Sequence, residues 1–326
     1  MNLTRVWSHP LITALLALLL VLALGLAFSG DGAFHKWVTH RDALRQASVY
    51  GILACGMTVV ILSGGIDLSV GSVLALSAVS FALTTIHRGW PAWAAIPACL
   101  VVGAACGALN GTLIVVWRIQ PFIVTLAMMV FARGLAKTLS GGMKVSTAVV
   151  GSDGSYTYVE LPRIFSLIDQ RLLGGNVSVV TLVFLACVAL TWVALRLTVW
   201  GRYAYALGGN EEASRFAGVP VGWMKVSVYA ACGLFAGLAG ICQAAQETHG
   251  DPETGMGNEL SAIAIVVIGG TSLQGGRGGI GLTLLGTLTL GYIEKILSIN
   301  AVGEASRLML TGAIIISAVL IQRRRG

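Results

Sequence analysis

An acidic residue lies among glycines and serines inside a long apolar run, where its carboxylate allows two kinds of chemistry. Asp67 follows the paired glycines Gly64 and Gly65 and precedes Ser69, within the stretch TVVILSGGIDLSVGSVLAL at residues 58–76. An ionisable group at membrane depth persists only where protein or trapped water surrounds it. Asp67 could cap a helix by accepting backbone N–H groups, or it could act in an internal pathway as a hydrogen-bond acceptor or proton carrier. Both interpretations stay open at this stage.

The glycines beside Asp67 interrupt the helix that the apolar residues would otherwise form. Gly64 and Gly65 each cost roughly 1 kcal/mol against alanine in a helix interior. Irregular backbone at membrane depth is tolerated only where it is buried in protein or lines a cavity. The stretch therefore predicts a helix break that faces a translocation pathway lined by Gly64, Gly65, Asp67 and Ser69.

The histidines and cysteines show no catalytic or metal-binding spacing. The five histidines are scattered among loops and ends, without an HExxH or Ser/His/Asp arrangement. The six cysteines lie in apolar segments and are expected to be small buried hydrophobic residues. The chain also lacks a G-x-x-x-x-G-K-[ST] phosphate loop. We therefore expect a transport subunit rather than an enzyme, with no catalytic residue, no metal and no cofactor bound by this chain.

The composition predicts an all-α polytopic membrane protein with a single transmembrane domain over residues 1–326. The chain is 56% hydrophobic and 11% charged, whereas soluble domains carry about 25% charged residues. Its net charge of +7 comes from scattered basic residues, apart from the arginine run at 323–325. This pattern indicates contact with membrane lipid rather than nucleic acid, and a basic tail after an apolar helix indicates a cytoplasmic C-terminus.

Apolar segments close to the ~20 residues that a bilayer requires predict about ten transmembrane helices, although eight to eleven remain compatible with the sequence. An even number places the N- and C-termini on the same, cytoplasmic side. The sequence does not decide whether 47–86 and 260–297 are re-entrant or full spans. The predicted spans are 11–29, 46–63, 68–86, 91–117, 121–139, 177–197, 224–246, 260–270, 280–297 and 307–321.

Two polar loops separate these spans. Residues 141–176 are expected to form an external loop with some structure of its own. Residues 198–223 are expected to form a cytoplasmic loop that contains a turn and a short helix. In that loop a Gly208-Gly209-Asn210 turn precedes the helix formers Glu211 to Ala217, and Gly218 ends them. Asn210 is a good N-cap and acidic residues favour a helix N-terminus, so the loop predicts a short helix suited to docking another protein.

A weak internal repeat indicates a second broken segment and pseudo-symmetric halves. Residues 59–76 and 266–285 both contain an apolar run, a glycine break with a polar residue, and a second apolar run. Interrupted segments in corresponding halves mark transport pathways, which adds Gly269, Gly270 and Thr271 to the predicted lining. Elsewhere, Gly103, Gly107 and Gly111 recur every four residues and predict close helix packing.

Three stretches of the chain resemble one known family. SGGIDLSVGS, YALGGNEEASRFAGV and PETGMGNELSAIAIVVIGGTSLQGGRG are similar to signature stretches of the permease subunits of bacterial ribose-type ABC sugar importers, in the branched-chain amino acid/ribose permease superfamily. The resemblance covers residues 47–320. Ser214, Arg215 and Glu294 depart from the pattern, the first two in the expected docking helix and the third in the expected pathway.

The resemblance implies an assembly in the bacterial inner membrane. It contains two permease subunits, as a homodimer or a heterodimer, with cytoplasmic ATP-binding cassette subunits that bind ATP and Mg and a periplasmic sugar-binding protein. The loop of residues 208–218 resembles the family's ATPase-coupling helix. The residues expected to take part in coupling are Gly208, Gly209, Asn210, Glu211, Ala213, Arg215 and Gly218.

The expected function is therefore ATP-driven import of a monosaccharide, whose identity the sequence does not specify. The alternative is a proton-coupled secondary transporter of a small polar solute that uses Asp67 as its titrating carrier. Only the ATP-driven interpretation requires the docking helix of residues 208–218.

Overall fold

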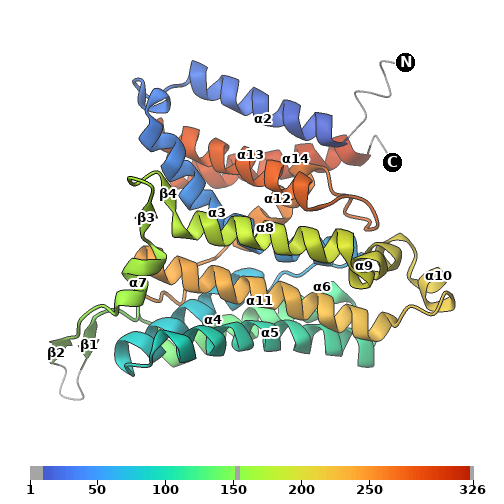
Figure 1. Ribbon diagram of the computed structural model, residues 1–326, viewed down its shortest axis with the longest axis horizontal. Coiled ribbons are helices and arrows are strands. Elements are labelled where there is room, and N and C mark those ends of the chain that lie inside the picture. Colours follow the sequence, from blue (N-terminus) through green and yellow to red (C-terminus); the bar gives the residue numbers. More distant parts are fainter. Residues whose placement is uncertain (1–9, 151–154, 324–326) are drawn as a thin grey trace.

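The computed structural model describes residues 10–150 and 155–323, which form a bundle of helices roughly parallel to its long axis (Figure 1). The longer helices are α2 (Pro10–Ala27), α3 (Trp37–Leu62), α4 (Val70–Ala82) continued by η2 (Leu83–His87), α5 (Ala92–Val116), α6 (Pro121–Ser140), α8 (Val179–Leu197), α11 (Val221–Glu247), α12 (Asn258–Gly269), α13 (Ile280–Ile299) and α14 (Glu304–Arg323).

Shorter elements occupy the two ends of the bundle (Figure 1). The end with α9 and α10 is called the α10 end below, and the end with the four strands is called the hairpin end. These elements are η1 (Ala33–His35), β1 (Ala148–Val150), β2 (Tyr156–Tyr158), α7 (Arg163–Ile168), β3 (Arg171–Leu172), β4 (Val177–Ser178), α9 (Val199–Gly209) and α10 (Glu211–Phe216).

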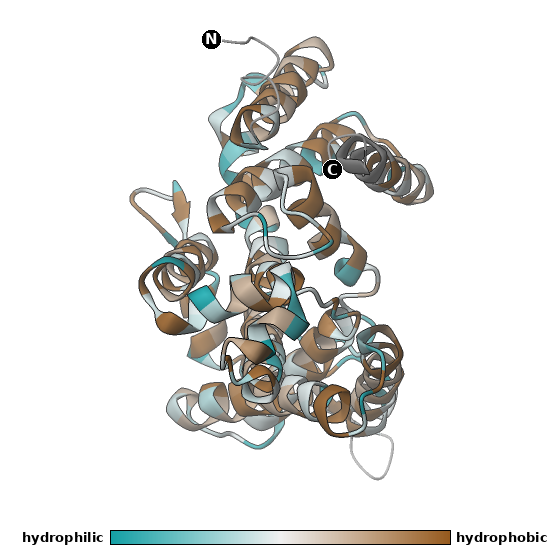
Figure 2. Cartoon of the chain, turned by 90° about the vertical axis from the view of Figure 1, so that its right-hand side faces the viewer, coloured by the Kyte–Doolittle hydropathy of each residue, from teal (hydrophilic) through white to brown (hydrophobic). Residues whose placement is uncertain are grey.

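The helices have the length and surface of a membrane protein. Within the described residues, eight helices are long and apolar enough to cross a bilayer. Seen from the α10 end, the helices at the rim are coloured mostly as hydrophobic (Figure 2), and large apolar side chains such as Phe131 are 62% exposed. Such a surface suits a lipid environment. These features bear out the polytopic helical class, while the number of crossings and the side of the termini stay predictions.

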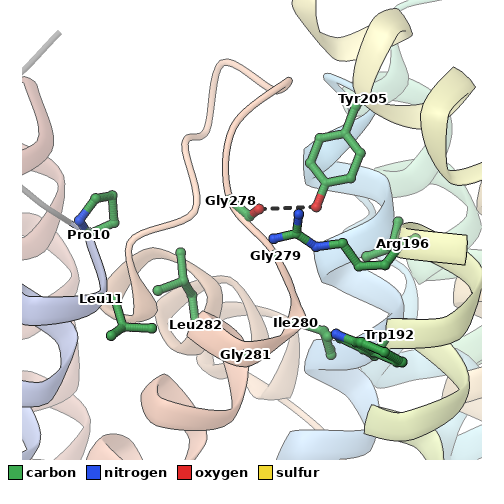
Figure 3. A pocket seen from close by; sticks show the side chains of 11 residues that line it. Pro10, Leu11, Trp192, Arg196, Tyr205, Gly278, Gly279, Ile280, Gly281 and Leu282 are labelled. Atoms are coloured by element: carbon green, nitrogen blue, oxygen red, sulfur yellow. Dashed lines mark hydrogen bonds between the residues drawn. The ribbon is translucent and has the colours of Figure 1, made fainter.

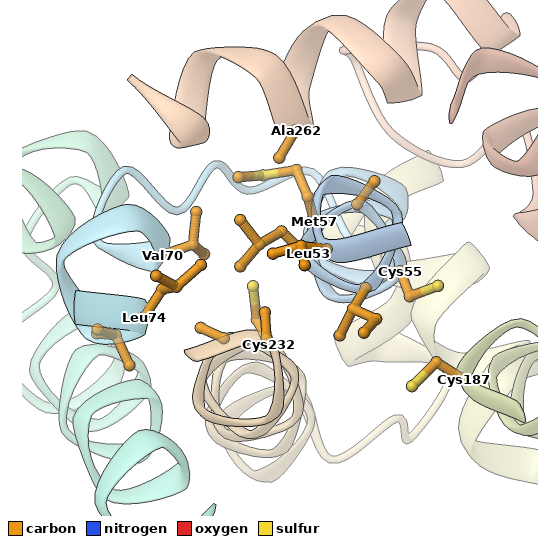
Figure 4. Close-up of a cluster of buried hydrophobic side chains, with 14 of the residues drawn as sticks. Leu53, Cys55, Met57, Val70, Leu74, Cys187, Cys232 and Ala262 are labelled. Atoms are coloured by element: carbon orange, nitrogen blue, oxygen red, sulfur yellow. The ribbon is translucent and has the colours of Figure 1, made fainter. Parts of the chain in front are cut away.

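The core lies where α3, α4, α11 and α12 meet. Leu53 of α3, Val70 of α4, Cys232 of α11 and Ala262 of α12 point toward one another in this buried cluster (Figure 4). The six cysteines are free thiols, five of them buried, as expected for small hydrophobic residues. The helix break at residues 63–69 therefore adjoins the most tightly enclosed part of the bundle.

The glycine ridge on α5 packs against α11 as the sequence predicts. A Cβ atom at Gly107 would lie 2.0 Å from the carbonyl oxygen of Tyr229, and one at Gly103 would lie 2.3 Å from that of Gly233. Gly111 meets the Cα of Val226 at 2.6 Å in the same construction. Because the α5 glycines have no side chains, the two backbones approach closely.

The predicted spans 11–29 and 46–63 leave a connector between them, and this expectation is wrong, since α3 begins at Trp37 instead of residue 46. The charged residues there are accommodated by partners from the loop after α6. Arg45 pairs with Asp169, and Arg171 pairs with Asp42 at 2.8 Å. Residues 31–45 thus form η1 and the first turns of a helix rather than a free linker.

The two long loops also contain more structure than the sequence indicates. Two antiparallel hairpins, β1–β2 and β3–β4, flank α7 in residues 148–178, so the second hairpin ends just beyond the predicted loop of residues 141–176. Asp153 lies outside the described residues. In residues 198–223, Gly208 and Gly209 are the last residues of α9 rather than a turn. The chain turns only at Asn210, between α9 and α10.

The repeat between 59–76 and 266–285 does not describe equivalent elements. The break at residues 63–69 connects a long helix, α3, to a shorter one, α4. Residues 270–279 instead connect short α12 to long α13. The segment that follows a long helix and precedes a short one in the second half is 248–257, between α11 and α12. Shared composition misled the comparison because both linkers are rich in glycine.

We predict that the packing of α5 on α11 makes Gly107 intolerant of any side chain. Gly107→Ala should lower the free energy of unfolding by about 1–3 kcal/mol, as overpacking does in a close-packed interface. Gly134→Ala is the matched control, because a Cβ there meets nothing within 4 Å, and it should be neutral or slightly stabilising. Thermal unfolding in detergent measures both, and equal stability of the two variants would contradict the packing argument.

Candidate translocation and coupling site

A buried polar network shapes the break between α3 and α4. Gly64 adopts a left-handed φ of +83°. Asp67 is only 1% exposed, and its Oδ1 accepts hydrogen bonds from Ser69 N at 2.9 Å and Ser69 Oγ at 2.6 Å. Asn110 Nδ2 of α5 donates to the same Ser69 hydroxyl at 3.0 Å. The network fixes the turn that leads into α4.

The carboxylate of Asp67 accepts the backbone N–H of Ser69 at the entry to α4, as the capping interpretation expects. α4 itself begins at Val70, with Ser69 at its N-cap position, and the Ser69 side chain makes no cap hydrogen bond. The Oδ2 atom of Asp67 is buried and has no hydrogen-bond partner within the described residues, and the Cys232 thiol of α11 lies close to the carboxyl group. The sequence analysis missed Asn110, although an amide within the glycine-rich apolar segment 92–116 was a usable signal.

The N-terminal ends of the two shorter helices meet inside the bundle. A Cβ atom at Gly71, in the first turn of α4, would lie 2.3 Å from both Glu259 Oε2 and the carbonyl oxygen of Gly255. Glu259 lies in the first turn of α12. The partial positive ends of α4 and α12 therefore share a region with the carboxylate of Glu259, and Asp67 precedes α4, which suits a polar solute better than a hydrophobic one.

Cations from α6 and the residues that follow it hold the connector between α11 and α12. Arg133 Nη1 donates to the carbonyl oxygens of Pro252 and Thr254, at 2.6 and 2.7 Å. Lys137 pairs with Glu253 at 2.9 Å. Arg133 and Lys137 thus have defined partners in the connector.

Asp251 belongs to the same connector. Burial alone would raise the pKa of its carboxyl group, but the hydrogen bond from Glu253 N and the nearby ammonium of Lys144 outweigh that effect and lower the pKa. A lowered folded-state pKa contributes stability at neutral pH and loses it as the pH falls through that pKa. The connector is therefore held most firmly when Asp251 is ionised.

Three stretches that are distant in sequence meet at the α10 end, in what we call the glycine junction (Leu62, Gly64, Gly208, Gly275 and Gly276). Gly276 N donates to the carbonyl oxygen of Leu62 at 2.9 Å. A Cβ atom at Gly208 would lie 1.9 Å from that oxygen, and one at Gly275 would lie 2.9 Å from Gly64 N. Only glycine allows these three backbones to approach so closely.

The loop 270–279 continues from the glycine junction. Thr271 is buried, and its Oγ1 accepts a hydrogen bond from Gly279 N at 3.3 Å. Tyr205 of α9 donates through its hydroxyl to the carbonyl oxygen of Gly278 at 3.1 Å (Figure 3). Beside this loop lies a cavity of about 320 Å³ into which Arg196 of α8 projects (Figure 3). The Thr271 bond closes the loop on itself, and the Tyr205 bond joins the loop to α9.

The predicted docking helix is present as α10. Asn210 caps it by accepting a hydrogen bond from Ala213 N at 2.9 Å. Glu211 in its first turn pairs with Lys225 of α11 at 2.7 Å. Gly218, with φ +81°, ends the turn that follows. Phe216 is 84% exposed and was missed by the sequence analysis, although an aromatic residue in a charged surface helix was a signal.

The predicted lining residues form two groups rather than one pathway surface. Gly65, Asp67 and Ser69 face α5 and α11, where a Cβ at Gly65 would meet the Tyr229 hydroxyl at 2.5 Å. Gly64, Gly270 and Thr271 belong to the α10 end, and Gly269 packs on the backbone of Leu282 in α13. The predicted coupling residues divide likewise: Gly208 lies in the glycine junction, whereas Ala213, Arg215 and Gly218 are exposed.

Substitutions at Asp67 should separate a structural from a direct role. Asp67→Ala removes both acceptor interactions with Ser69 and should lower the free energy of unfolding by about 2 kcal/mol, at roughly 1 kcal/mol for each hydrogen bond. Asp67→Asn retains an acceptor oxygen and should keep both stability and most solute transport. Thermal unfolding and uptake assays measure these effects. Loss of transport by a stable Asp67→Asn variant would instead favour a proton carrier.

Residues 41–319 match the family described as branched-chain amino acid transport system / permease component. The chain is 40% identical over 285 residues to the ribose import permease protein of Escherichia coli (strain K12), with 87% of this chain and 85% of the relative covered. It is 35% identical over 321 residues to the fructose import permease protein of Rhizobium meliloti, covering 97% and 86%. No solved structure matches it.

A third relative extends the range of sugars. The xylose transport system permease protein of Escherichia coli (strain K12) is 31% identical over 356 residues, with 94% of this chain and 90% of the relative covered. The matched region includes the helix break, α10 and the loop 270–279, so the resemblance noted from the sequence is confirmed. The chain belongs to the branched-chain amino acid transport system / permease component family, as a multi-pass inner-membrane permease of the sugar-import type.

Proposed function

We propose that the chain is the membrane-spanning permease subunit of an ATP-driven importer that moves a monosaccharide across the inner membrane. Ribose, fructose and xylose, which appear in the names of its relatives, are all monosaccharides. The proposed assembly pairs this chain with a second permease subunit, cytoplasmic ATP-binding cassette subunits and a periplasmic sugar-binding protein. ATP and Mg are bound by the partner, because this chain lacks a phosphate loop.

The observation that carries the proposal is the glycine junction. It places the last turn of α9, next to the exposed α10, against the end of α3 and against the loop 270–279. A displacement of α10 therefore reaches both irregular segments through backbone contacts, without passing through flexible side chains. A passive channel or a secondary transporter has no need of such a link to an exposed helix.

The proposed mechanism follows that link. A cytoplasmic subunit binds α10, with Phe216 as its apolar anchor, and closes on binding ATP. Closure moves α10 and α9, and the glycine junction transmits the movement to the end of α3 and to α13. Rigid-body tilting of helices about a packed interface is an established form of switching, and here it opens the pathway to each side in turn.

The proposed pathway passes the inner ends of α4 and α12. The segments 63–69 and 248–257, each followed by a short helix, form the pseudo-symmetric pair in this proposal. Discontinuous helices with their N-terminal ends at the midplane are typical of transporter binding sites. With few charged groups beside Glu259 and Asp67, the region suits weak, transient contact with a neutral hydroxylated solute, while high affinity belongs to the sugar-binding protein.

We predict that α10 determines association with the ATPase subunit. Phe216→Asp should weaken association about tenfold or more, because burial of a phenylalanine side chain contributes about 1.5–3 kcal/mol. Arg215→Glu should also weaken it by reversing an exposed charge. Arg202→Glu is the matched control, since Arg202 is an exposed cation on α9. The measurement is a pull-down of the chain from native membranes, with the co-purifying subunits quantified.

Two outcomes would contradict this proposal. One is retention of the ATPase subunit by both α10 variants at the level of the control. The other is a chain that purifies alone and moves solute into liposomes under a pH gradient. The second outcome would support the proton-coupled alternative with Asp67.

The glycine junction generates a separate prediction about coupling. Gly208→Ala places a Cβ against the Leu62 carbonyl oxygen, whereas a Cβ at the neighbouring Gly209 meets nothing within 4 Å. Gly208→Ala should therefore reduce sugar transport about tenfold or more, the effect of 1.4 kcal/mol or more of overpacking, while the ATPase subunit still binds. Gly209→Ala should transport normally. ATP-dependent uptake in proteoliposomes tests the pair, and equal transport would contradict transmission through this contact.

A further inference from the structure

A second cavity lies at the hairpin end, away from the break and from α10. Its volume is about 560 Å³, and its lining comes from η1, α3, α13 and the residues around β4. On α3 the lining positions are 37, 40, 41, 43, 44 and 47, most of them on one face of the helix at the i, i+3, i+4 spacing. Opposite them lie Leu288, Gly291 and Tyr292 of α13. The cavity is thus a groove between two helices.

The top of the groove is polar and aromatic. Trp37 is 64% exposed, and its indole Nε1 donates to Asn176 Oδ1 at 2.8 Å. His40 Nδ1 lies 3.2 Å from the hydroxyl of Tyr292. Tryptophan and tyrosine are enriched at the level of lipid headgroups, so this part of the groove has the composition of a membrane interface.

Arg41 supplies a cation at the top of the groove, and no carboxylate among the described residues pairs with it. Its Nη1 donates to the carbonyl oxygen of Gly175 at 3.0 Å, but its buried Nε makes no hydrogen bond to any described residue. The nearby carboxylates are already committed, Asp42 to Arg171 and Asp169 to Arg45. Arg41 lines the groove, and a guanidinium with no carboxylate partner among the described residues is complementary to a phosphate group.

Below Arg41 the groove becomes apolar. Leu44, Ala47, Val177 and Leu288 line it. From Arg41 to Ala47 the helix rises about 9 Å, at 1.5 Å per residue. That is roughly a third of the ~30 Å hydrocarbon core, so the apolar part of the groove holds the upper part of an acyl chain. A monosaccharide is much shorter than this groove and needs hydrogen-bond partners that its lower part lacks.

We propose that this groove binds one glycerophospholipid, with the phosphate on Arg41 and an acyl chain along α3 and α13. Charge complementarity at the top and the apolar wall below both favour this occupant. The proposal is independent of the transported solute and of the ATPase partner. The bound lipid then fills the space between α3 and α13 at the hairpin end.

The test is native mass spectrometry of the full chain, purified in mild detergent and titrated with palmitoyl-oleoyl phosphatidylglycerol. One lipid should bind more tightly than the rest. Arg41→Gln should weaken that first binding about tenfold, the scale of a charge-assisted hydrogen bond, and Arg41→Lys should weaken it less. Leu44→Trp fills the groove and should also displace the lipid. Arg88→Gln is the control, because Arg88 is exposed at the same end.

Further measurements distinguish a bound lipid from free phosphate and from a second copy of the chain. Inorganic phosphate and glycerol phosphate should not compete, since they lack the acyl chain, and effective competition by either would overturn the lipid assignment. A Leu44→Trp variant that changes the ratio of monomer to dimer but keeps its lipid would instead make the groove an interface between copies. If Arg41→Gln fails to fold, the other two variants provide the test. Unchanged first-lipid affinity in both Leu44→Trp and Arg41→Lys, in proteins with the wild-type melting temperature, would also overturn the proposal.

Discussion

The carbonyl oxygen of Leu62 ends α3 at a fully buried residue, and a buried carbonyl needs a hydrogen-bond donor from the protein. Gly276 N supplies it, and Gly208 packs directly against the same oxygen. This single contact therefore fixes where the first helix break can lie, where the loop 270–279 must pass and how closely α9 can approach. The rest of the α10 end is arranged around it.

The interior of the bundle follows from the same requirement at other positions. Polar backbone in the irregular segments must be satisfied without water, so side chains are recruited for the purpose. Asp67 accepts a hydrogen bond from Ser69 in the turn before α4, and Asn110 donates one to the Ser69 hydroxyl. Arg133 donates to carbonyl oxygens of the connector before α12. Charged and amide groups that look like transport residues in the sequence thus hold the backbone on which a pathway can be built.

The bundle combines a tightly packed helix pair with helix ends that, in our proposal, move together. Glycine ridges lock α5 to α11, which leaves little freedom within that pair. The helix ends at the glycine junction meet through close backbone contacts, and α10 projects from them with its aromatic residue exposed. In our proposal, force applied at α10 therefore moves whole helices instead of being absorbed by side-chain rotations.

Composition and periodicity alone determined the helical membrane class, the approximate helix positions, the glycine ridge and the short helix α10, because these depend on local hydrophobicity, capping and spacing. Tertiary structure decided the rest. The helical start of α3 depends on ion pairs with Asp169 and Arg171, more than 120 residues away. The role of Asp67 depends on Asn110 and Cys232 from other helices. The glycine junction arises only when three distant backbones meet, and no local pattern encodes which glycines will touch.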